Sequence, residues 1–205
     1  MPHPAWNEYY ASGELPWDTG EPEPLLVEFV TSGRVAPGRA LEIGAGTGTN
    51  ALWLAEHGFD VLGLDISPLA VEKAEAKLES RDLQCCFAEF DILTASPRGG
   101  PFEFVFDRGC FHVFDEQDER TRFAVHVAAA LASSGLWLSL IGSTEGRPRE
   151  FGPPRRSAQE VVLAIEPVLE IKELRSAEFR AHDAKAWFCL SQRRTIPAQP
   201  STRHD

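Results

Sequence analysis

The chain has 205 residues, 43% of them hydrophobic, which suffices for one well-buried core and is too short for two ordinary domains. A formal net charge of −11, with no basic stripe to offset it, repels phosphate backbones and argues against nucleic acid as a partner. The four cysteines show neither a disulfide framework nor metal-ligand spacing, which predicts a reducing, cytoplasmic setting and no metal site.

Alternating apolar runs and helical patterns predict βα units that build a mostly parallel sheet. The expected strands are 40–43, 61–65, 85–89, 102–107 and 136–141, and the helices between them are 49–57, 68–80 and 116–131. The apolar run 125–142 is broken by Ser133-Ser134-Gly135, a turn signal, so it predicts a helix end and a buried strand rather than a membrane span. The first ten residues lack the basic and apolar regions of a signal peptide.

The last third of the chain changes character. The sequence predicts a long irregular loop at 142–154, followed by a helix at 157–166 that Ser157 would cap. Two alternating strands follow, with a polar turn around His182-Asp183 between them, and they predict a terminal antiparallel pair at 171–179 and 186–192.

The strongest local signal is a glycine turn in Leu41-Glu42-Ile43-Gly44-Ala45-Gly46-Thr47-Gly48-Thr49-Asn50, between a buried strand and a helix. Dinucleotide enzymes use a similar turn, so other features must decide the ligand. Thr49 stands where the dinucleotide fingerprint has its third glycine. Glu42 suits the ammonium and sulfonium of S-adenosylmethionine and would repel a pyrophosphate, and too little chain remains for a separate substrate domain. The turn therefore favours S-adenosylmethionine.

Two further aspartates follow predicted strands. Asp65 ends the second strand, where an acidic side chain can bind both ribose hydroxyls; alternatively it caps the next helix. Asp91 follows the third strand, and either accepts from the adenine amino group, with Ile66 and Ile92 on the ring faces, or is a solvated turn residue.

The N-terminal segment carries a narrower resemblance. Trp6-Asn7-Glu8-Tyr9-Tyr10 and Gly13-Glu14-Leu15-Pro16-Trp17-Asp18-Thr19-Gly20, followed by Glu21-Pro22-Glu23-Pro24-Leu25, precede the glycine turn. With that turn, they make the chain resemble the class I S-adenosylmethionine-dependent methyltransferases, within the branch of thiopurine, halide/thiol and tellurite-resistance methyltransferases. The class-wide match covers roughly residues 35–190; the N-terminal match is shorter and more specific.

This resemblance implies an α/β, Rossmann-like methyltransferase fold: a mostly parallel seven-stranded sheet with helices on both faces and a C-terminal antiparallel hairpin. We expect a lid arm and helix at 1–34, a cofactor-binding domain at 35–192 and a disordered tail at 193–205. Trp6 and Trp17 would fold over the cofactor, where aromatic faces attract a sulfonium, and the arm would order when cofactor binds. Alternatively, the arm plugs a core edge.

The segment Phe106-Asp107-Arg108-Gly109-Cys110-Phe111-His112 ends the fourth strand, at the sheet edge where open α/β sheets bind their ligands. It departs from the aromatic residues of plant halide/thiol enzymes, which puts a halide acceptor in doubt. Asp107 or His112 would orient or deprotonate the acceptor, or His112 is structural. Arg108 pairs with Asp107 or binds an acidic acceptor, and Arg155 and Arg156 either grip a carboxylate or form a solvated face.

The sequence thus predicts a methyltransferase for a small molecule, with S-methylation of a thiol or similar soft nucleophile as the leading reaction. The alternatives are an O-, N- or metalloid methyltransferase, such as one for tellurite, and a cofactor-binding sensor without catalysis. We expect a monomer or weak homodimer with no membrane partner. The expected catalytic residues are Asp107, His112 and Arg108, and the expected cofactor-binding residues are Trp6, Trp17, Glu42, Gly44, Gly46, Gly48, Asn50, Asp65, Ile66, Asp91, Ile92 and Asp107.

Overall fold

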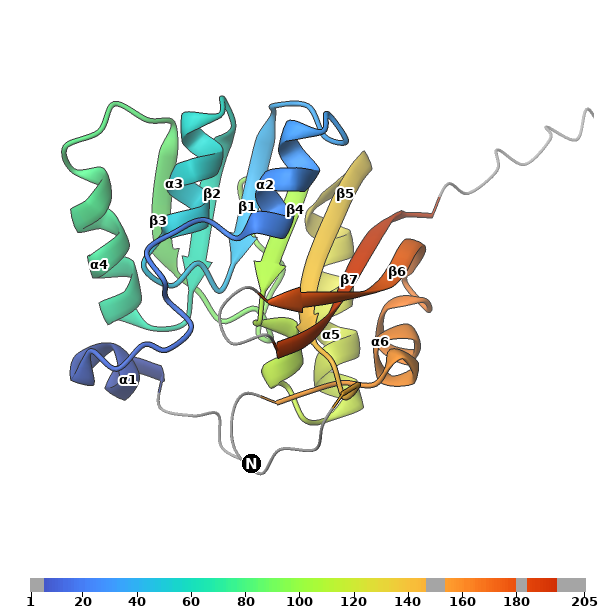
Figure 1. Ribbon diagram of the computed structural model, residues 1–205. Helices are drawn as coiled ribbons and strands as arrows, with labels where there is room; N and C mark the ends of the chain where they lie inside the picture. Colours follow the sequence, from blue (N-terminus) through green and yellow to red (C-terminus); the bar gives the residue numbers. More distant parts are fainter. Residues whose placement is uncertain (1–5, 147–153, 180–183, 195–205) are drawn as a thin grey trace, which may run out of the picture.

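A computed structural model describes residues 6–146, 154–179 and 184–194. Its seven-stranded sheet has the order β3-β2-β1-β4-β5-β7-β6 (Figure 1). Strands β1 to β5 run parallel to one another, and β7 is antiparallel to both β5 and β6. This confirms the predicted Rossmann-like sheet with its terminal antiparallel pair. The strands are β1 Arg39–Ile43, β2 Asp60–Asp65, β3 Cys85–Glu89, β4 Phe102–Arg108, β5 Leu131–Gly142, β6 Leu169–Phe179 and β7 Ala184–Arg193.

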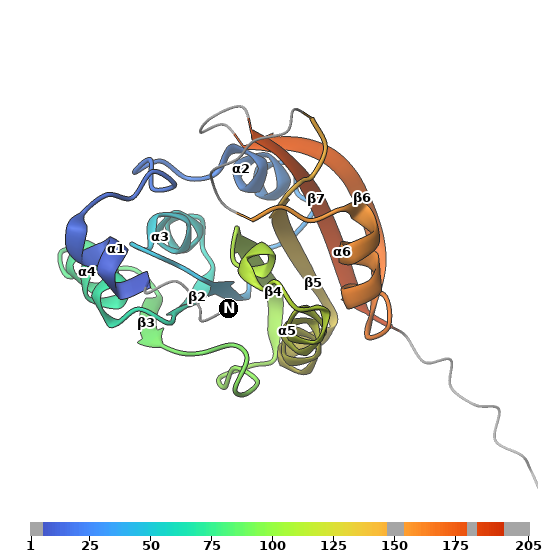
Figure 2. The ribbon, with the colours of Figure 1, turned by 90° about the horizontal axis from the view of Figure 1, so that it is seen from below.

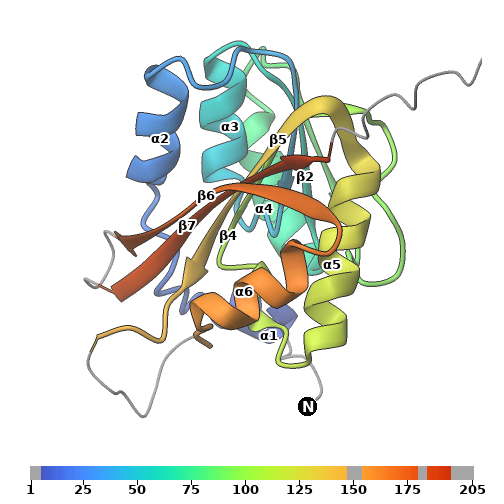
Figure 3. The same ribbon diagram turned by 90° about the vertical axis from the view of Figure 1, so that its right-hand side faces the viewer.

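Helices cover both faces of the sheet because successive strand residues point to opposite sides. Leu41 and Val105 join a core cluster with α5 and α6, whereas Ala40 and Phe104 join a second cluster with α2 and α3. Figure 3 shows α2 and α3 on one side of the sheet and α5 on the other. The helices are α1 Trp6–Ser12, α2 Pro24–Thr31, α3 Thr49–Glu56, α4 Pro68–Leu78, the 3-10 turn η1 Phe111–Val113, α5 Gln117–Ala130 and α6 Ala158–Ile165.

The start of β5 differs from the prediction. The strand begins at Leu131 and runs through Ser133-Ser134-Gly135, where the sequence predicts a turn. Leu131 pairs with Phe102 and Leu136 with Phe104, so the triplet is an irregularity within the ladder. A Cβ on Gly135 would lie 2.6 Å from the Phe102 carbonyl oxygen, so the glycine permits close strand approach.

The remaining boundaries agree closely with expectation. Helix α6 begins at the predicted cap, where Ser157 Oγ accepts from the Glu160 amide. Strand β7 extends to Arg193, one residue beyond its expected end, and Arg193 Nη1 donates to the Leu131 carbonyl. The expected turn at His182-Asp183 and residues 195–205 of the expected tail lie outside the described residues. Within the described ranges, we find no helix with the length and apolarity needed to cross a membrane.

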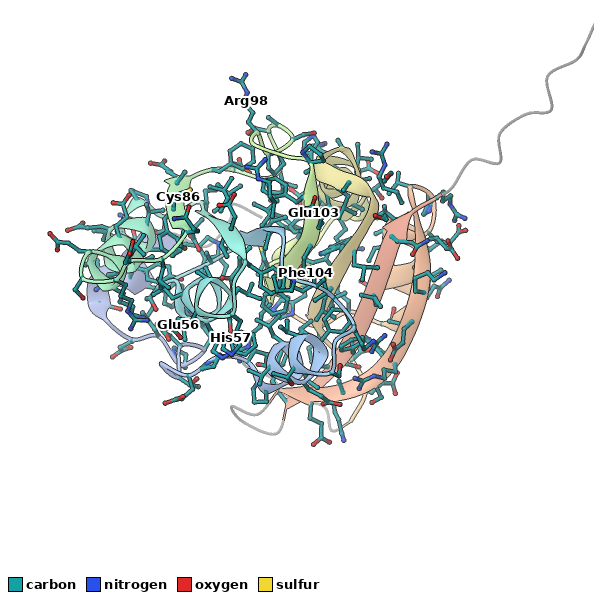
Figure 4. All side chains as sticks on the ribbon, turned by 90° about the horizontal axis from the view of Figure 1, so that it is seen from above. Glu56, His57, Cys86, Arg98, Glu103 and Phe104 are labelled. Atoms are coloured by element: carbon teal, nitrogen blue, oxygen red, sulfur yellow. The ribbon has the colours of Figure 1, made fainter. Side chains whose placement is uncertain are left out.

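The two ends of the parallel strands have different character. Helix α1 lies near their carboxyl ends, the end seen in Figure 2. Figure 4 shows the opposite end, where Glu56 and His57 close α3 and Cys86 stands on the edge strand β3. There Glu56 pairs with Arg81 at 2.7 Å, and none of these residues lines the cavity described next.

Candidate active site

A cavity of about 1590 Å³ opens at the carboxyl ends of the parallel strands, between the glycine turn, the N-terminal arm, α2 and the last two strands. Ligand sites in open α/β sheets occupy this edge. The volume exceeds the range of roughly 300–1,000 Å³ usual for one small ligand, so it holds space for two. The predicted site residues that line it are Trp6, Trp17, Glu42, Gly44, Gly46, Asn50, Asp65, Ile66, Asp91, Ile92, Arg108 and His112.

The glycine turn shapes one wall of the cavity. The Gly44 amide donates to the Leu64 carbonyl at 2.7 Å, which docks the turn on β2. Gly44 and Gly46 have φ of 71° and 57°, and a Cβ on Gly44 would lie 2.9 Å from the Cys110 Cβ. Gly48 does not line the cavity, contrary to its expected cofactor contact. Its Cβ position lies 2.7 Å from the Phe87 ring, so it is a packing residue at the start of α3.

Glu42 places a buried carboxylate in this wall. Its side chain is 1% exposed, and its Oε1 accepts from Asn50 Nδ2 at 3.0 Å. Oε2 accepts no hydrogen bond from the described residues. Burial raises the pKa of Glu42 to about 8. Asn50 also accepts from the Glu23 amide at 2.9 Å, so it joins the glycine turn to the arm.

Asp65 binds backbone amides with both carboxylate oxygens. Oδ2 accepts from the Gly46 amide at 2.8 Å and Oδ1 from the Ser67 amide at 2.9 Å. It does not cap α4, because Ser67 Oγ accepts from the Ala70 amide in that role. Burial raises the pKa of Asp65. Asp65 therefore connects the glycine turn to the start of α4, and Ile66 beside it is 41% exposed.

Asp91 and Ile92 follow β3 at the same edge. Asp91 Oδ1 accepts from the Leu93 amide at 2.8 Å, the hydrogen bond expected if Asp91 is a turn residue. Asp91 and Ile92 also line the cavity, so the turn role and a ligand contact are compatible.

The arm brings an aromatic cluster over the cavity. Trp17 lies at its centre, with ring centroids 5.8 Å from Trp6, 5.5 Å from Tyr9 and 6.3 Å from Tyr10. Tyr10 is buried, and burial with the nearby Asp65 carboxylate raises the pKa of its phenol. Such a cluster suits a cationic ligand.

Two sets of hydrogen bonds tether the arm. Thr47 Oγ1 donates to Asp18 Oδ2 at 2.6 Å and accepts from Lys77 Nζ at 2.5 Å. Ser67 Oγ donates to Asn7 Oδ1 at 2.8 Å, which docks α1 on the first turn of α4. The arm is therefore attached at the glycine turn and at α4.

Arg108 pairs with Glu23 and not with Asp107. Its Nε donates to Glu23 Oε2 at 2.6 Å, its Nη1 donates to the Trp17 carbonyl at 3.2 Å, and its guanidinium lies 5.0 Å from the Phe179 ring centroid. Adjacent strand residues point to opposite faces, which separates Arg108 from Asp107.

Asp107 lies outside the cavity, contrary to its expected contacts with cofactor and acceptor. It is fully buried, and it accepts from the Phe111 amide at 3.0 Å and from Trp137 Nε1 at 2.9 Å. Burial raises the pKa of Asp107 to about 6. The carboxylate therefore joins η1, which contains His112, to β5.

His112 has its tautomer set by one backbone bond. The Gly142 amide donates to His112 Nδ1 at 2.6 Å, and an amide N–H can only donate. The neutral ring therefore carries its proton on Nε2 and has no lone pair left to take another. Arg156, expected as a substrate ligand or a solvated side chain, is 7% exposed, donates to the His112 carbonyl at 3.1 Å and pairs with Asp115 at 2.7 Å.

Comparison with known proteins defines the family. The thiopurine S-methyltransferase family model matches residues 1–189. The chain belongs to the thiopurine S-methyltransferase family.

Curated relatives of this thiopurine S-methyltransferase family protein include two enzymes named for thiol or thiocyanate methylation and one named for a hydroxyquinolone. A probable thiol methyltransferase 2 of Arabidopsis thaliana is 32% identical over 73% of the chain and 65% of the relative. Thiocyanate methyltransferase 1 of Brassica oleracea is 31% identical over 75% of the chain and 67% of the relative. A 2-heptyl-1-hydroxyquinolin-4(1H)-one methyltransferase of Mycobacteroides abscessus is 34% identical over 68% of the chain and 61% of the relative. The chain thus spans about two thirds of the length of these relatives.

Solved structures share the fold. One described as the conversion of a disulfide bond into a thioacetal group during echinomycin biosynthesis has a TM-score of 0.80 and 26% identity, covering 94% of this chain and 92% of that one. TehB from Haemophilus influenzae has a TM-score of 0.70 at 16% identity, over 92% of this chain and 67% of its own, which supports the fold alone.

Several lining residues are not predicted from the sequence. Tyr10, Thr47 and Glu23 belong to the N-terminal motif or the glycine turn, and this membership is the sequence signal that points to them. Phe179 and Ala184 come from the terminal strands and carry no local signal. Tertiary packing alone brings them to the cavity.

Proposed function

We propose that the protein transfers the methyl group of S-adenosylmethionine to the sulfur of a small thiol. Family membership and relatives named thiol and thiocyanate methyltransferases support this reaction. The observation that carries the cofactor assignment is Glu42, a buried carboxylate in the cavity wall whose Oε2 receives no hydrogen bond from the described residues.

The residues present fit this cofactor. A bound ammonium or sulfonium would favour the charged form of Glu42 and pair with it, and Gly44 and Gly46 allow close approach to the turn. The aromatic cluster around Trp17 provides faces for a cation. S-adenosylmethionine supplies an electrophilic methyl carbon when bound.

The adenosine part of S-adenosylmethionine occupies the region of the cavity beside Asp65 and Asp91. Asp65 binds the ribose hydroxyls, Asp91 accepts from the adenine amino group, and Ile66 and Ile92 pack on the ring. The location of all four in the cavity lining supports these roles.

The placement of the two expected bases favours a thiol over an alcohol, a phenol or an amine. His112 holds its proton on Nε2, and Asp107 is outside the cavity, so neither is placed to deprotonate an acceptor. A thiol with a pKa of about 8.5 is a few per cent thiolate at neutral pH without a base, whereas a phenol with a pKa of about 10 is far less ionised. The chain's part is to align the thiolate with the methyl carbon and to exclude water.

We further propose that the protein acts in the cytoplasm as a monomer or weak homodimer on a small-molecule acceptor, with no nucleic-acid partner. Its four cysteines are free, which fits a reducing compartment, and its net charge of −11 disfavours nucleic acid.

Calorimetric titration with S-adenosylhomocysteine, followed by a product-release assay on the same sample, tests the proposal. The panel holds a thiol, a phenol, an amine and tellurite. We expect binding and thiol-selective turnover. Selective turnover of another acceptor would replace the thiol assignment, binding without turnover would favour a sensor, and absence of binding would refute the cofactor assignment.

A further inference from the structure

The cavity divides into two halves along the sheet. One half lies at the ends of β1, β2 and β3 and contains Asp65 and Asp91. The other, here called the acceptor half, lies toward β4, β7 and β6 and contains Arg108, Phe179 and Ala184, with Val27 and Glu28 from α2. If the proposed function holds and the cofactor fills the first half, the non-reacting part of the thiol must occupy the second.

The positive charge in the acceptor half is already compensated. Among the described lining residues, Arg108 is the one arginine or lysine. Its partner Glu23 is 3% exposed at the side chain, 2.6 Å away, and Arg108 also packs on Phe179. Arg108 and Glu23 together contribute no net charge, so Arg108 offers little attraction to an anionic acceptor.

Two further carboxylates stand at the mouth of the acceptor half. Glu21 and Glu28 are exposed and line the cavity. Glu28 also lines a small neighbouring pocket with Arg34 and Arg175, and these arginines form their ion pairs with Glu173. The surfaces beside the two rim carboxylates are apolar, from Val27 and Phe179. The acceptor half is therefore an apolar surface with a negative rim.

We infer that the acceptor half selects thiols whose remaining groups are uncharged or cationic, and discriminates against thiols that carry a carboxylate, with Glu28 and Glu21 as specificity-determining residues. This inference rests on the proposed function. The negative charge of the reacting thiolate is not disfavoured in this way. It would lie beside the cofactor's positive charge, while the rest of the acceptor would extend toward the rim.

The expected discrimination follows from Coulomb repulsion. Consider an acceptor carboxylate about 8 Å from each rim residue, at an effective dielectric constant of about 40. Each rim charge then lowers kcat/KM for that acceptor roughly fivefold. Two rim charges and partial screening give about tenfold in kcat/KM at low salt, and the effect shrinks at 1 M salt, where the Debye length is about 3 Å.

Three thiols of similar size test this on the wild-type protein: propanethiol, 2-aminoethanethiol and 3-mercaptopropionate. Rates are compared per thiolate, with each thiol's own pKa measured. We expect kcat/KM for 3-mercaptopropionate to be about tenfold below that of propanethiol at low ionic strength, and the gap to close at 1 M salt. Equal use of the two thiols at low salt, or a preference for 3-mercaptopropionate, would overturn the inference and leave the S-methyltransferase function standing.

A charge reversal assigns the effect to one residue. Glu28→Lys should raise kcat/KM for 3-mercaptopropionate, relative to that for propanethiol, about tenfold. It should lower kcat/KM for 2-aminoethanethiol relative to that for propanethiol. The matched control is Glu75→Lys, the same change on exposed α4 away from the cavity, which should leave both ratios as in the wild type. Equal ratios in Glu28→Lys and the control would remove Glu28 from the mechanism. Failure of all three thiols, with S-adenosylhomocysteine still bound, would refute the proposed function and this inference together.

Discussion

At the scale of single residues, burial dominates the chemistry of Glu42. Burial raises the pKa of Glu42 from 4.5 to about 8, and the hydrogen bond that Oε1 accepts from Asn50 offsets only part of this rise. The raised pKa means that the ligand-free folded protein binds this proton more tightly than the unfolded chain does. Stability contributed by the protonated group is complete below pH 4.5 and is lost as pH rises toward 8.

Glu42→Gln should remove this pH dependence. We expect the ligand-free variant to gain on the order of a few kcal/mol of unfolding free energy over wild type at pH 8, and much less at pH 5. Urea unfolding at both pH values measures the difference, with the exposed Glu75→Gln as the matched control. The variant should also bind S-adenosylhomocysteine more weakly. A constant difference between Glu42→Gln and wild type across this pH range would contradict the assignment.

At the end of β4, residue type alone does not determine the role of a polar side chain. Asp107, Arg108 and His112 have the chemistry of catalytic groups, and each is engaged by another part of the fold. Arg108 is bound by Glu23 from 85 positions away, and His112 by Gly142 from 30 positions away. Periodicity within β4 carries no information on either partner.

At the scale of elements, the start of α3 depends on a glycine for two separate reasons. Gly48 caps the helix in the left-handed region with φ 79°, and no side chain assists it. Its Cβ position lies 2.7 Å from the Phe87 ring and 2.9 Å from the Ala74 Cβ. Conformation and close packing therefore both select glycine.

Gly48→Ala and Gly33→Ala separate these two effects. Gly33 has φ 74° with open space around its Cβ position, so alanine there should cost only the conformational strain of about 1 kcal/mol. Gly48→Ala should cost roughly 1–3 kcal/mol more, because α4 and β3 must move to admit the methyl group. Denaturant unfolding gives both values, and equal losses would mean that packing at Gly48 contributes nothing.

Element type was well predicted because apolar spacing and capping residues are local. The triplet Ser133-Ser134-Gly135 shows the limit. Small polar residues and glycine indicate a turn when read alone, yet the triplet stays extended within β5, between the pairs Leu131–Phe102 and Leu136–Phe104. Pairing of β5 with β4 before and after the triplet overrides its local preference.

At the scale of the whole molecule, the cavity is lined by segments that lie far apart in the sequence, including the N-terminal arm. Helix α1 is attached through Asn7, whose Oδ1 accepts from Ser67 Oγ at 2.8 Å and from the Leu69 amide at 3.2 Å. These bonds join the arm to α4, next to the Asp65 that we assign to the cofactor. Cofactor binding and arm docking should therefore stabilise each other.

Asn7→Ala tests this coupling. Losing both bonds should increase proteolysis within residues 1–20 and weaken S-adenosylhomocysteine binding by roughly fivefold, about 1 kcal/mol of lost hydrogen bonding. Ser12→Ala is the control, because its hydroxyl bonds only within the arm, to Tyr9 and Glu14. Saturating S-adenosylhomocysteine should slow the proteolysis in wild type. Unchanged affinity in Asn7→Ala despite faster cleavage would show that the arm and the site are independent.

The sequence alone determined the fold class, the order of the elements and the glycine turn, since these depend on patterns within ten or twenty neighbouring residues. It also placed Glu42, Asp65 and Asp91 at one edge of the sheet, because carboxyl ends of parallel strands meet there, whereas the expected position of the arm tryptophans came from the family resemblance. Only the tertiary structure decided which polar groups are engaged and which face the cavity. Hydrogen-bond partners such as Glu23 for Arg108 come from elements far apart in the chain, and packing alone selects them.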